Sequence, residues 1–191
     1  MEIEKTLVLF KPDAVQRGIV GEILSRFEKI GLKIIAIKML DARDEQLATH
    51  YFKDDDWLIK KGKNLIDKKG YANDYDPKKA GQEIITGLIY DMKTSPIIAM
   101  VLEGYNAIKT VKRLTGPTNI DEAAPGTIRG DYSHDTYTLA NISDRPIITI
   151  IHATDNINEA EKEISIWFNP SEIHSYEKLD SQIHYRKGKI N

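Results

Sequence analysis

A histidine at the end of an apolar segment, followed by an acidic helix, is the most reactive combination in this sequence. The segment 146–152 reads PIITIIH, and Glu163 follows eleven residues after His152. A neutral imidazole is a nucleophile at physiological pH and can form phosphohistidine. A carboxylate bonded to one ring nitrogen fixes the tautomer and frees the other nitrogen to attack. The alternatives are a satisfied structural histidine and glutamates that only suit the helix dipole.

Two further segments carry groups that suit phosphate. Lys11 ends a strand-like segment, and an ammonium group is a suitable partner for a phosphate oxygen. Residues 109–130 place Lys112, Thr118 and Arg129 among glycine and proline turns. Hydroxyl and guanidinium groups on a shaped loop can grip a polyphosphate. The alternatives are a solvated strand end and ordinary loop polarity.

A third segment, His50-Tyr51-Phe52, places two aromatic side chains where they could stack on a nucleotide base or pack in the core. The familiar motifs of other enzyme classes are missing. The sequence has no GxxxxGK[ST] loop, no GxGxxG, no HExxH and no GxSxG. P-loop kinases, protein kinases, zinc proteases and serine hydrolases of those types are therefore unsupported.

Composition limits the class further. The 191 residues include 27 basic and 29 acidic side chains, a net charge of -2, and no cysteine. A protein built mainly to bind nucleic acid usually has a basic excess, and disulfides or thiolate metal sites need cysteine. The apolar runs are strand-sized, and the N-terminus lacks a secretory pattern. We expect a cytoplasmic protein with no membrane span and no dedicated nucleic-acid partner.

Hydrophobic periodicity predicts the elements that must position these residues. We expect strands at 5–11, 32–40, 95–102 and 146–152. We expect helices at 20–30, 44–51, 77–92, 105–114 and 158–168, with a short amphipathic helix at 57–68 and a long loop at 120–144. This order favours an α+β fold, a ferredoxin-like βαββαβ sandwich whose four-stranded antiparallel sheet carries helices on one face.

Four segments in this order resemble nucleoside diphosphate kinases over most of the chain. They are FKPDAVQRG at 10–18, HY at 50–51, PGTIRGDY at 125–132, and IIHATD at 150–155 followed by EAEKEISIWF at 159–168. Each alone is weak, but the four together have compatible spacing. The resemblance implies a single domain spanning 1–191, with insertions at approximately 53–76 and 133–145.

The resemblance also implies roles for single residues. His152 is the expected nucleophile, Glu163 orients it, and Thr154 stands where the family has a serine that bonds this glutamate. The expected nucleotide-binding residues are Lys11, Tyr51, Phe52, Lys112, Thr118, Arg129 and Thr149. Lys112 replaces a family arginine and Thr149 a common asparagine, while Phe52 or Trp57 would replace the base-stacking phenylalanine.

The implied reaction is ping-pong transfer of a γ-phosphoryl group from ATP or another nucleoside triphosphate to a nucleoside diphosphate, through phosphohistidine at His152. Mg²⁺ is the implied cofactor, held mainly by the nucleotide phosphates. The family is usually hexameric or tetrameric, so we expect a homo-oligomer. The alternative is a non-catalytic nucleotide-binding or regulatory oligomer on the same fold, because one fold can host many functions.

Overall fold

The strand at the centre of the molecule is buried on both sides. In the computed structural model, which describes residues 3–70 and 74–179, β1 spans Ile3–Phe10. Leu7 and Leu9 contribute to one hydrophobic cluster, and Val8 and Phe10 to another. Because successive side chains of a strand point to opposite faces, both faces of the sheet carry a core.

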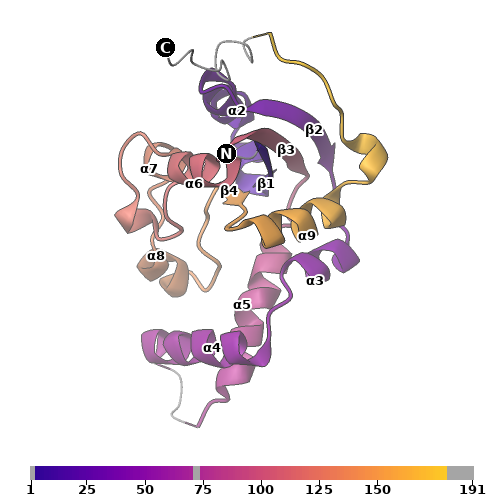
Figure 1. The fold of residues 1–191 in the computed structure, drawn as a ribbon. Coiled ribbons are helices and arrows are strands. Elements are labelled where there is room, and N and C mark those ends of the chain that lie inside the picture. Colours follow the sequence, from indigo (N-terminus) through magenta and orange to yellow (C-terminus); the bar gives the residue numbers. More distant parts are fainter. Residues whose placement is uncertain (1–2, 71–73, 180–191) are drawn as a thin grey trace, which may run out of the picture.

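The sheet has the topology expected from the sequence. β1 pairs antiparallel with β3 (Ile97–Tyr105) and with β4 (Ile151–Ala153), and β3 pairs antiparallel with β2 (Lys33–Leu40). The resulting order is β2-β3-β1-β4 (Figure 1). The prediction of a four-stranded antiparallel sheet in a ferredoxin-like α+β fold is therefore confirmed.

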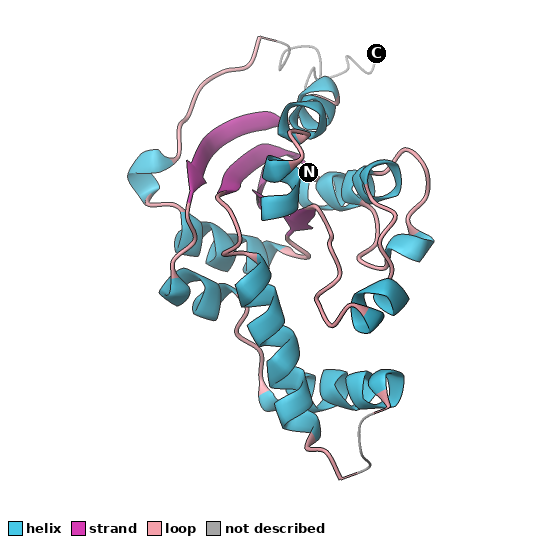
Figure 2. Ribbon diagram, turned by 180° about the vertical axis from the view of Figure 1, so that it is seen from behind, coloured by secondary structure: helices cyan, strands magenta, loops and turns pink. Residues whose placement is uncertain are grey.

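Helices cover both faces, so the expectation of helices on one face was wrong. The crossover helices α2 (Val20–Lys29) and α6 (Ala107–Thr115) pack on the Val8 and Phe10 face. The opposite face is covered by α3 (Asp44–His50), α5 (Pro77–Asp91) and α9 (Ile157–Trp167), as Figure 2 also shows from behind. Within residues 3–70 and 74–179, every helix falls short of the length and apolarity needed to cross a bilayer.

The segment expected as a long loop contains short helices. Within 120–144, the structure has the 3₁₀ turn Ile120–Glu122 and the helices α7 (Ile128–Tyr132) and α8 (Tyr137–Ile142). Two further short elements lie elsewhere in the chain, α1 (Pro12–Gln16) and the 3₁₀ turn Pro170–Glu172. Helices this short show no 3.6-residue periodicity, so the pattern missed them. Their capping signals were present, since Thr127 and Thr136 accept hydrogen bonds from the backbone N–H groups of Gly130 and Leu139.

The last strand is shorter than the expected 146–152. Ile150 has a φ of 65°, a left-handed conformation that is a genuine outlier for a β-branched residue. The N–H of Ile151 donates to the carbonyl of Thr149 at 2.6 Å, which makes a tight bend before the strand. The Ile150 carbonyl accepts from the Lys11 N–H at 2.9 Å. This bend confines β4 to three residues and fixes its start beside Lys11.

The first predicted insertion forms a helix packed closely on α5. This helix, α4 (Asp55–Lys69), includes the one expected at 57–68. A Cβ on Gly62 would lie 1.7 Å from the carbonyl oxygen of Pro77, and one on Gly81 would lie 2.2 Å from that of Leu58. At Gly62 and Gly81 the two helices therefore lie so close together that no side chain larger than a hydrogen atom fits.

We predict that Gly81→Ala lowers the free energy of unfolding by about 1–3 kcal/mol, because the added methyl group must push α4 away from α5. The control is Gly21→Ala in α2, whose Cβ would meet open space. It should stabilise by up to about 1 kcal/mol, since alanine favours a helix over glycine. Urea titrations measure both, and equal effects would contradict the close contact.

Candidate active site

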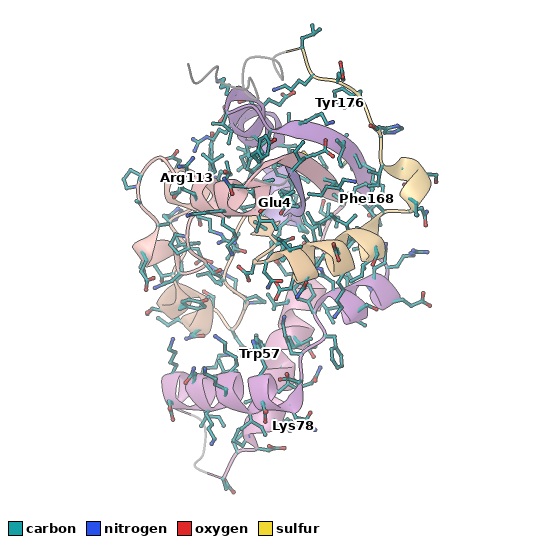
Figure 3. All side chains as sticks on the ribbon, in the orientation of Figure 1. Glu4, Trp57, Lys78, Arg113, Phe168 and Tyr176 are labelled. Carbon is teal, nitrogen blue, oxygen red and sulfur yellow. The ribbon has the colours of Figure 1, made fainter. Side chains whose placement is uncertain are left out.

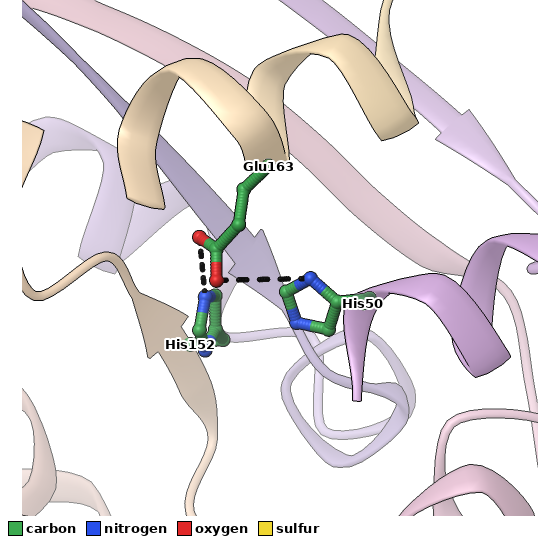
Figure 4. A group of neighbouring side chains, drawn as sticks. All are labelled: His50, His152 and Glu163. Atoms are coloured by element: carbon green, nitrogen blue, oxygen red, sulfur yellow. Dashed lines mark hydrogen bonds and ion pairs between the residues drawn. The ribbon is translucent and has the colours of Figure 1, made fainter. Parts of the chain in front are cut away.

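His152 lies at the middle of β4 with one ring nitrogen held by Glu163. The His152 Nε2 atom is 2.9 Å from Oε2 of Glu163 (Figure 4). The Thr154 hydroxyl donates to the same oxygen at 2.7 Å. Burial alone would raise the pKa of Glu163, but the bonds from His152 and Thr154 hold it below its ordinary value. The carboxylate is therefore charged, Nε2 carries the proton that it accepts, and Nδ1 keeps a free lone pair.

Local structure explains why these residues meet. The pairing of β4 with β1 sets His152 opposite Leu9. Along α9, the buried positions Ala160, Glu163 and Trp167 are spaced three and four residues apart, so they share the face that packs on the sheet. The acidic residue that the sequence singled out is thus the inward one, and His152, Glu163 and Thr154 come together as predicted.

His50 is a neighbour of the pair whose part sequence reasoning missed. Its ring lies edge-on to that of His152, with centroids 4.6 Å apart, and its Nδ1 lies 3.8 Å from Oε1 of Glu163. The indole N–H of Trp167 donates to the same Nδ1 at 3.4 Å. Burial, and then the proximity of His152, lower the pKa of His50 to about 3. His50 is therefore an uncharged side chain whose ring packs against His152 and restricts the orientation of its imidazole.

The same three side chains are close enough to share a metal ion. Ligand atoms of His50, His152 and Glu163 lie within 4.8 Å of one another, the only such group in the described part of the chain. Their facing atoms are already engaged, however, since Nε2 of His152 bonds Glu163 and Nδ1 of His50 accepts from Trp167. The arrangement suits the orientation of a nucleophile better than the ligation of a metal.

His152 opens onto a cleft of about 910 Å³. This cleft collects most of the predicted nucleotide-binding residues, although they come from five separate parts of the chain. Those that line it together with His152 are Lys11, Tyr51, Thr118, Arg129 and Thr149.

Two predicted residues are not brought to this cleft. The Phe52 ring is 69% exposed and has the Lys162 ammonium 5.9 Å from its centroid. Lys112 forms an ion pair with Asp155 and lines a different groove. Trp57, the other aromatic considered for stacking, does line the cleft. Phe52 and Lys112 were expected at the nucleotide-binding cleft, and the structure places both away from it. Phe52 follows the end of α3 into solvent, and Lys112 pairs with Asp155 instead.

Arg129 supplies a buried positive charge. Its guanidinium donates to the carbonyls of Gly116 and Ile151, both at 2.8 Å, and of Thr149 at 3.3 Å. A weaker contact reaches the Thr118 hydroxyl at 3.4 Å. Burial lowers its pKa to about 10, which still leaves it charged at neutral pH. Its bonds within residues 3–70 and 74–179 all go to uncharged oxygens, so the charge remains available to an anion.

Lys11 supplies a second basic group, and the Asp91 carboxylate favours its charged form. Lys11 is 5% exposed, with its Nζ 3.7 Å from Oδ2 of Asp91 at the end of α5. Burial lowers the pKa of Lys11, and the Asp91 carboxylate opposes that shift. Sequence reasoning missed Asp91 because nothing in its local pattern distinguishes it from a solvated acidic residue. Only the fold brings it to Lys11.

Tyr51 adds a hydroxyl to the same end of the cleft. Its Oη is buried and has no hydrogen-bond partner among the described residues. Burial, together with the nearby charges of Asp91 and Glu163, raises the pKa of this hydroxyl. It is therefore a neutral donor. An oriented nucleophilic nitrogen, two buried cations and hydroxyl donors around one cleft can accept and stabilise a phosphoryl group.

Comparison with known proteins points to one family. The profile of the family described as nucleoside diphosphate kinase matches residues 4–57 and 51–173. A protein named nucleoside diphosphate kinase from Pyrobaculum aerophilum is 44% identical over 181 residues, covering 91% of this chain and 99% of the relative.

Two solved structures have a similar fold. A crystal structure of an NDP kinase from Pyrobaculum aerophilum has a TM-score of 0.85 at 41% identity, covering 91% of this chain and all of the other. A Borrelia burgdorferi nucleoside-diphosphate kinase, described as a transition-state mimic with bound vanadate and ADP, has a TM-score of 0.79 at 34% identity. It covers 96% of this chain and 97% of its own.

We predict that His50 makes the protein less stable in acid. Because its folded pKa lies below that of an unfolded histidine, the unfolded state takes up the proton first. The free energy of unfolding should then fall as pH drops below about 6.5, by about 1.4 kcal/mol per pH unit. In His50→Gln, whose amide oxygen can still accept from Trp167, this contribution should disappear. Urea titrations between pH 7 and 4 measure it. The control is His134→Gln at an exposed position, and identical slopes in wild type and His50→Gln would refute the prediction.

Proposed function

Because this chain belongs to the nucleoside diphosphate kinase family, we propose that it transfers the γ-phosphoryl group of a nucleoside triphosphate to a nucleoside diphosphate through phosphohistidine at His152. The observation that carries this proposal is the bond between His152 Nε2 and Glu163 at 2.9 Å, beside a cleft lined by Lys11 and Arg129. It supports a nucleophilic Nδ1 with phosphate-binding cations around it.

In the proposed first half-reaction, Nδ1 of His152 attacks the γ-phosphorus and the bond from phosphorus to the β,γ-bridging oxygen breaks. The nucleoside diphosphate leaves with that electron pair. The proton on Nε2 stays in its bond to Glu163, so the charged carboxylate favours the imidazole that gains positive character. The second nucleoside diphosphate enters the same cleft and removes the phosphoryl group by the reverse displacement.

Lys11, Tyr51, Thr118 and Arg129 are proposed to bind the phosphates, with Thr149 near the sugar. Cations and hydroxyl groups at this end of the cleft fit phosphate oxygens better than a metal ion. Mg²⁺, the proposed cofactor, would therefore be held chiefly by the phosphates, and when bound it neutralises part of their charge. We assign no protein ligand to it.

The chain is proposed to act as one domain with insertions at approximately 53–76 and 133–145, in the cytoplasm, as a homo-oligomer. Support for assembly comes from β2, which pairs only with β3 among the described strands. Its Ile37 and Met39 side chains are 49% and 59% exposed. Apolar side chains on an edge strand are a typical interaction surface.

We predict that incubation with γ-labelled ATP and Mg²⁺ labels wild type with an acid-labile, base-stable group, and that His152→Ala abolishes the label. Glu163→Gln should slow labelling by about 10- to 100-fold, because the neutral amide still orients the ring but loses its charge. The rate is measured by quench-flow sampling and alkaline gels.

The matched control is Glu161→Gln, an exposed position two residues away on the same helix, which should label at the wild-type rate. Unlabelled wild type, or full labelling of His152→Ala, would overturn the assignment of the nucleophile.

We also predict that light scattering after size exclusion gives a mass several times that of the 21.7 kDa chain. The double variant Ile37→Lys and Met39→Lys should reduce that mass, because it places charge on the apolar edge of β2. The control is Ile142→Lys on α8, which adds one lysine charge at a position 79% exposed and remote from β2 in sequence. A monomeric wild type would exclude assembly, and an unchanged mass in the double variant would exclude this edge.

A further inference from the structure

The two predicted insertions line facing parts of the cleft. From α4 come Trp57, Lys61, Asn64, Leu65, Lys68 and Lys69. The second insertion contributes Tyr137, Ala140 and Asn141 from α8, and Asp144 just after it. Figure 1 shows α8 and α4 on the same side of the molecule, α8 beside the sheet domain and α4 below it. The cleft is therefore walled in part by segments to which the chemistry of His152 assigns no role.

Two side-chain contacts join these walls. Lys69 Nζ lies 2.5 Å from Oδ1 of Asp144, and Lys68 Nζ lies 5.1 Å from the centroid of the Tyr137 ring. The first is an ion pair and the second a cation–π contact. All four residues line the cleft, so both contacts connect α4 to the α8 segment at the cleft itself.

Each wall is attached to the rest of the molecule mainly through one neighbouring element or one small cluster. Helix α4 packs chiefly on α5, where Gly62 and Gly81 allow close approach. Helix α8 is anchored through Ala140, in a small cluster with Ile120 and Ile147. Segments with few buried apolar contacts open at low free-energy cost, so contacts between the walls have a large share in keeping them together.

Tyr137 also lies within electrostatic reach of the phosphate-binding end. The side chain is 38% exposed. Burial raises the pKa of its hydroxyl, and the nearby Arg129 guanidinium acts in the opposite direction. Tyr137 thus has the Lys68 ammonium over its ring and the buried arginine proposed to bind phosphate within electrostatic reach of its hydroxyl.

We propose that α4 and α8 form a clasp that retains the bound nucleotide, with Tyr137 and Lys68 contacting the nucleotide and the Lys69–Asp144 ion pair tying the two walls across it. This inference rests on the proposed function, because it takes the ligand of the cleft to be a nucleotide. Release of the diphosphate requires the tie to break, so the tie sets the dissociation rate.

Asp144→Asn is the sharpest variant, because it removes one charge and little else. Asp144 is 89% exposed on its side chain and has a φ of 47°. Asparagine adopts this left-handed conformation more readily than most residues. The backbone is therefore kept, while the ion pair to Lys69 is lost.

The test is stopped-flow measurement of a fluorescent ADP analogue binding to the full-length protein. Asp144→Asn should raise the dissociation rate about two- to fivefold, the range that an exposed ion pair is worth. Its association rate should not fall, since the entrance is less restrained. The difference from wild type should shrink in about 1 M salt, where the ion pair is screened. Tyr137→Leu, which removes the other contact, should raise the dissociation rate as well.

The matched control is Asp55→Asn. It breaks the Lys78–Asp55 pair, 2.7 Å long, which ties α4 to α5 outside the cleft lining. Figure 3 labels Lys78 at the lower end of the molecule. The control should keep the wild-type rate. The clasp is refuted if Asp144→Asn and Tyr137→Leu both dissociate at the wild-type rate, or if Asp55→Asn dissociates as fast as they do. Failure of the proposed function shows separately, as wild type that takes no label from ATP.

Discussion

The hydrogen bond between Glu163 and Nε2 of His152 governs the chemistry of this molecule. A carboxylate that is 9% exposed would ordinarily tend to protonate, and a protonated Glu163 would no longer fix the imidazole tautomer. Bonds from His152 and Thr154 keep it charged instead. Trp167 donates to the neutral ring of His50, and that ring packs edge-on against His152, so the imidazole is confined on that side. The nucleophile is therefore prepared before any substrate binds, as electrostatic preorganisation requires.

At the other side of the cleft, burial acts on two basic side chains rather than on a carboxylate. Lys11 and Arg129 are each 5% exposed, and removing a cation from water costs free energy. Hydrogen bonds from Arg129 to backbone carbonyls offset that cost. The ion pair with Asp91 offsets part of it for Lys11. Among the described residues, the bonds of Arg129 go to uncharged oxygens, so a polyphosphate in the cleft meets its charge. In a low-dielectric site such charge acts more strongly than it would on the surface.

Backbone strain joins these two halves of the site. Ile150 holds a left-handed conformation and gives its carbonyl to the N–H of Lys11. The next residues enter β4, where His152 faces Leu9. A strained residue persists only where its surroundings over-determine it, and here the buried sheet does so. The strain and the register together set the nucleophile beside the cations, while the insertions add walls without altering that core.

Sequence alone determined the four-stranded antiparallel sheet, the longer helices and the pairing of His152 with Glu163. Those features depend on local periodicity and on motifs with fixed spacing, which one chain displays directly. Tertiary structure alone decided the helices on the second face, the three-residue β4, the role of Asp91 and the displacement of Phe52 and Lys112 from the cleft. Each of these depends on which side chain meets which partner across long sequence separations. Burial and electrostatic competition settle such contacts, and neither has a signature in local sequence.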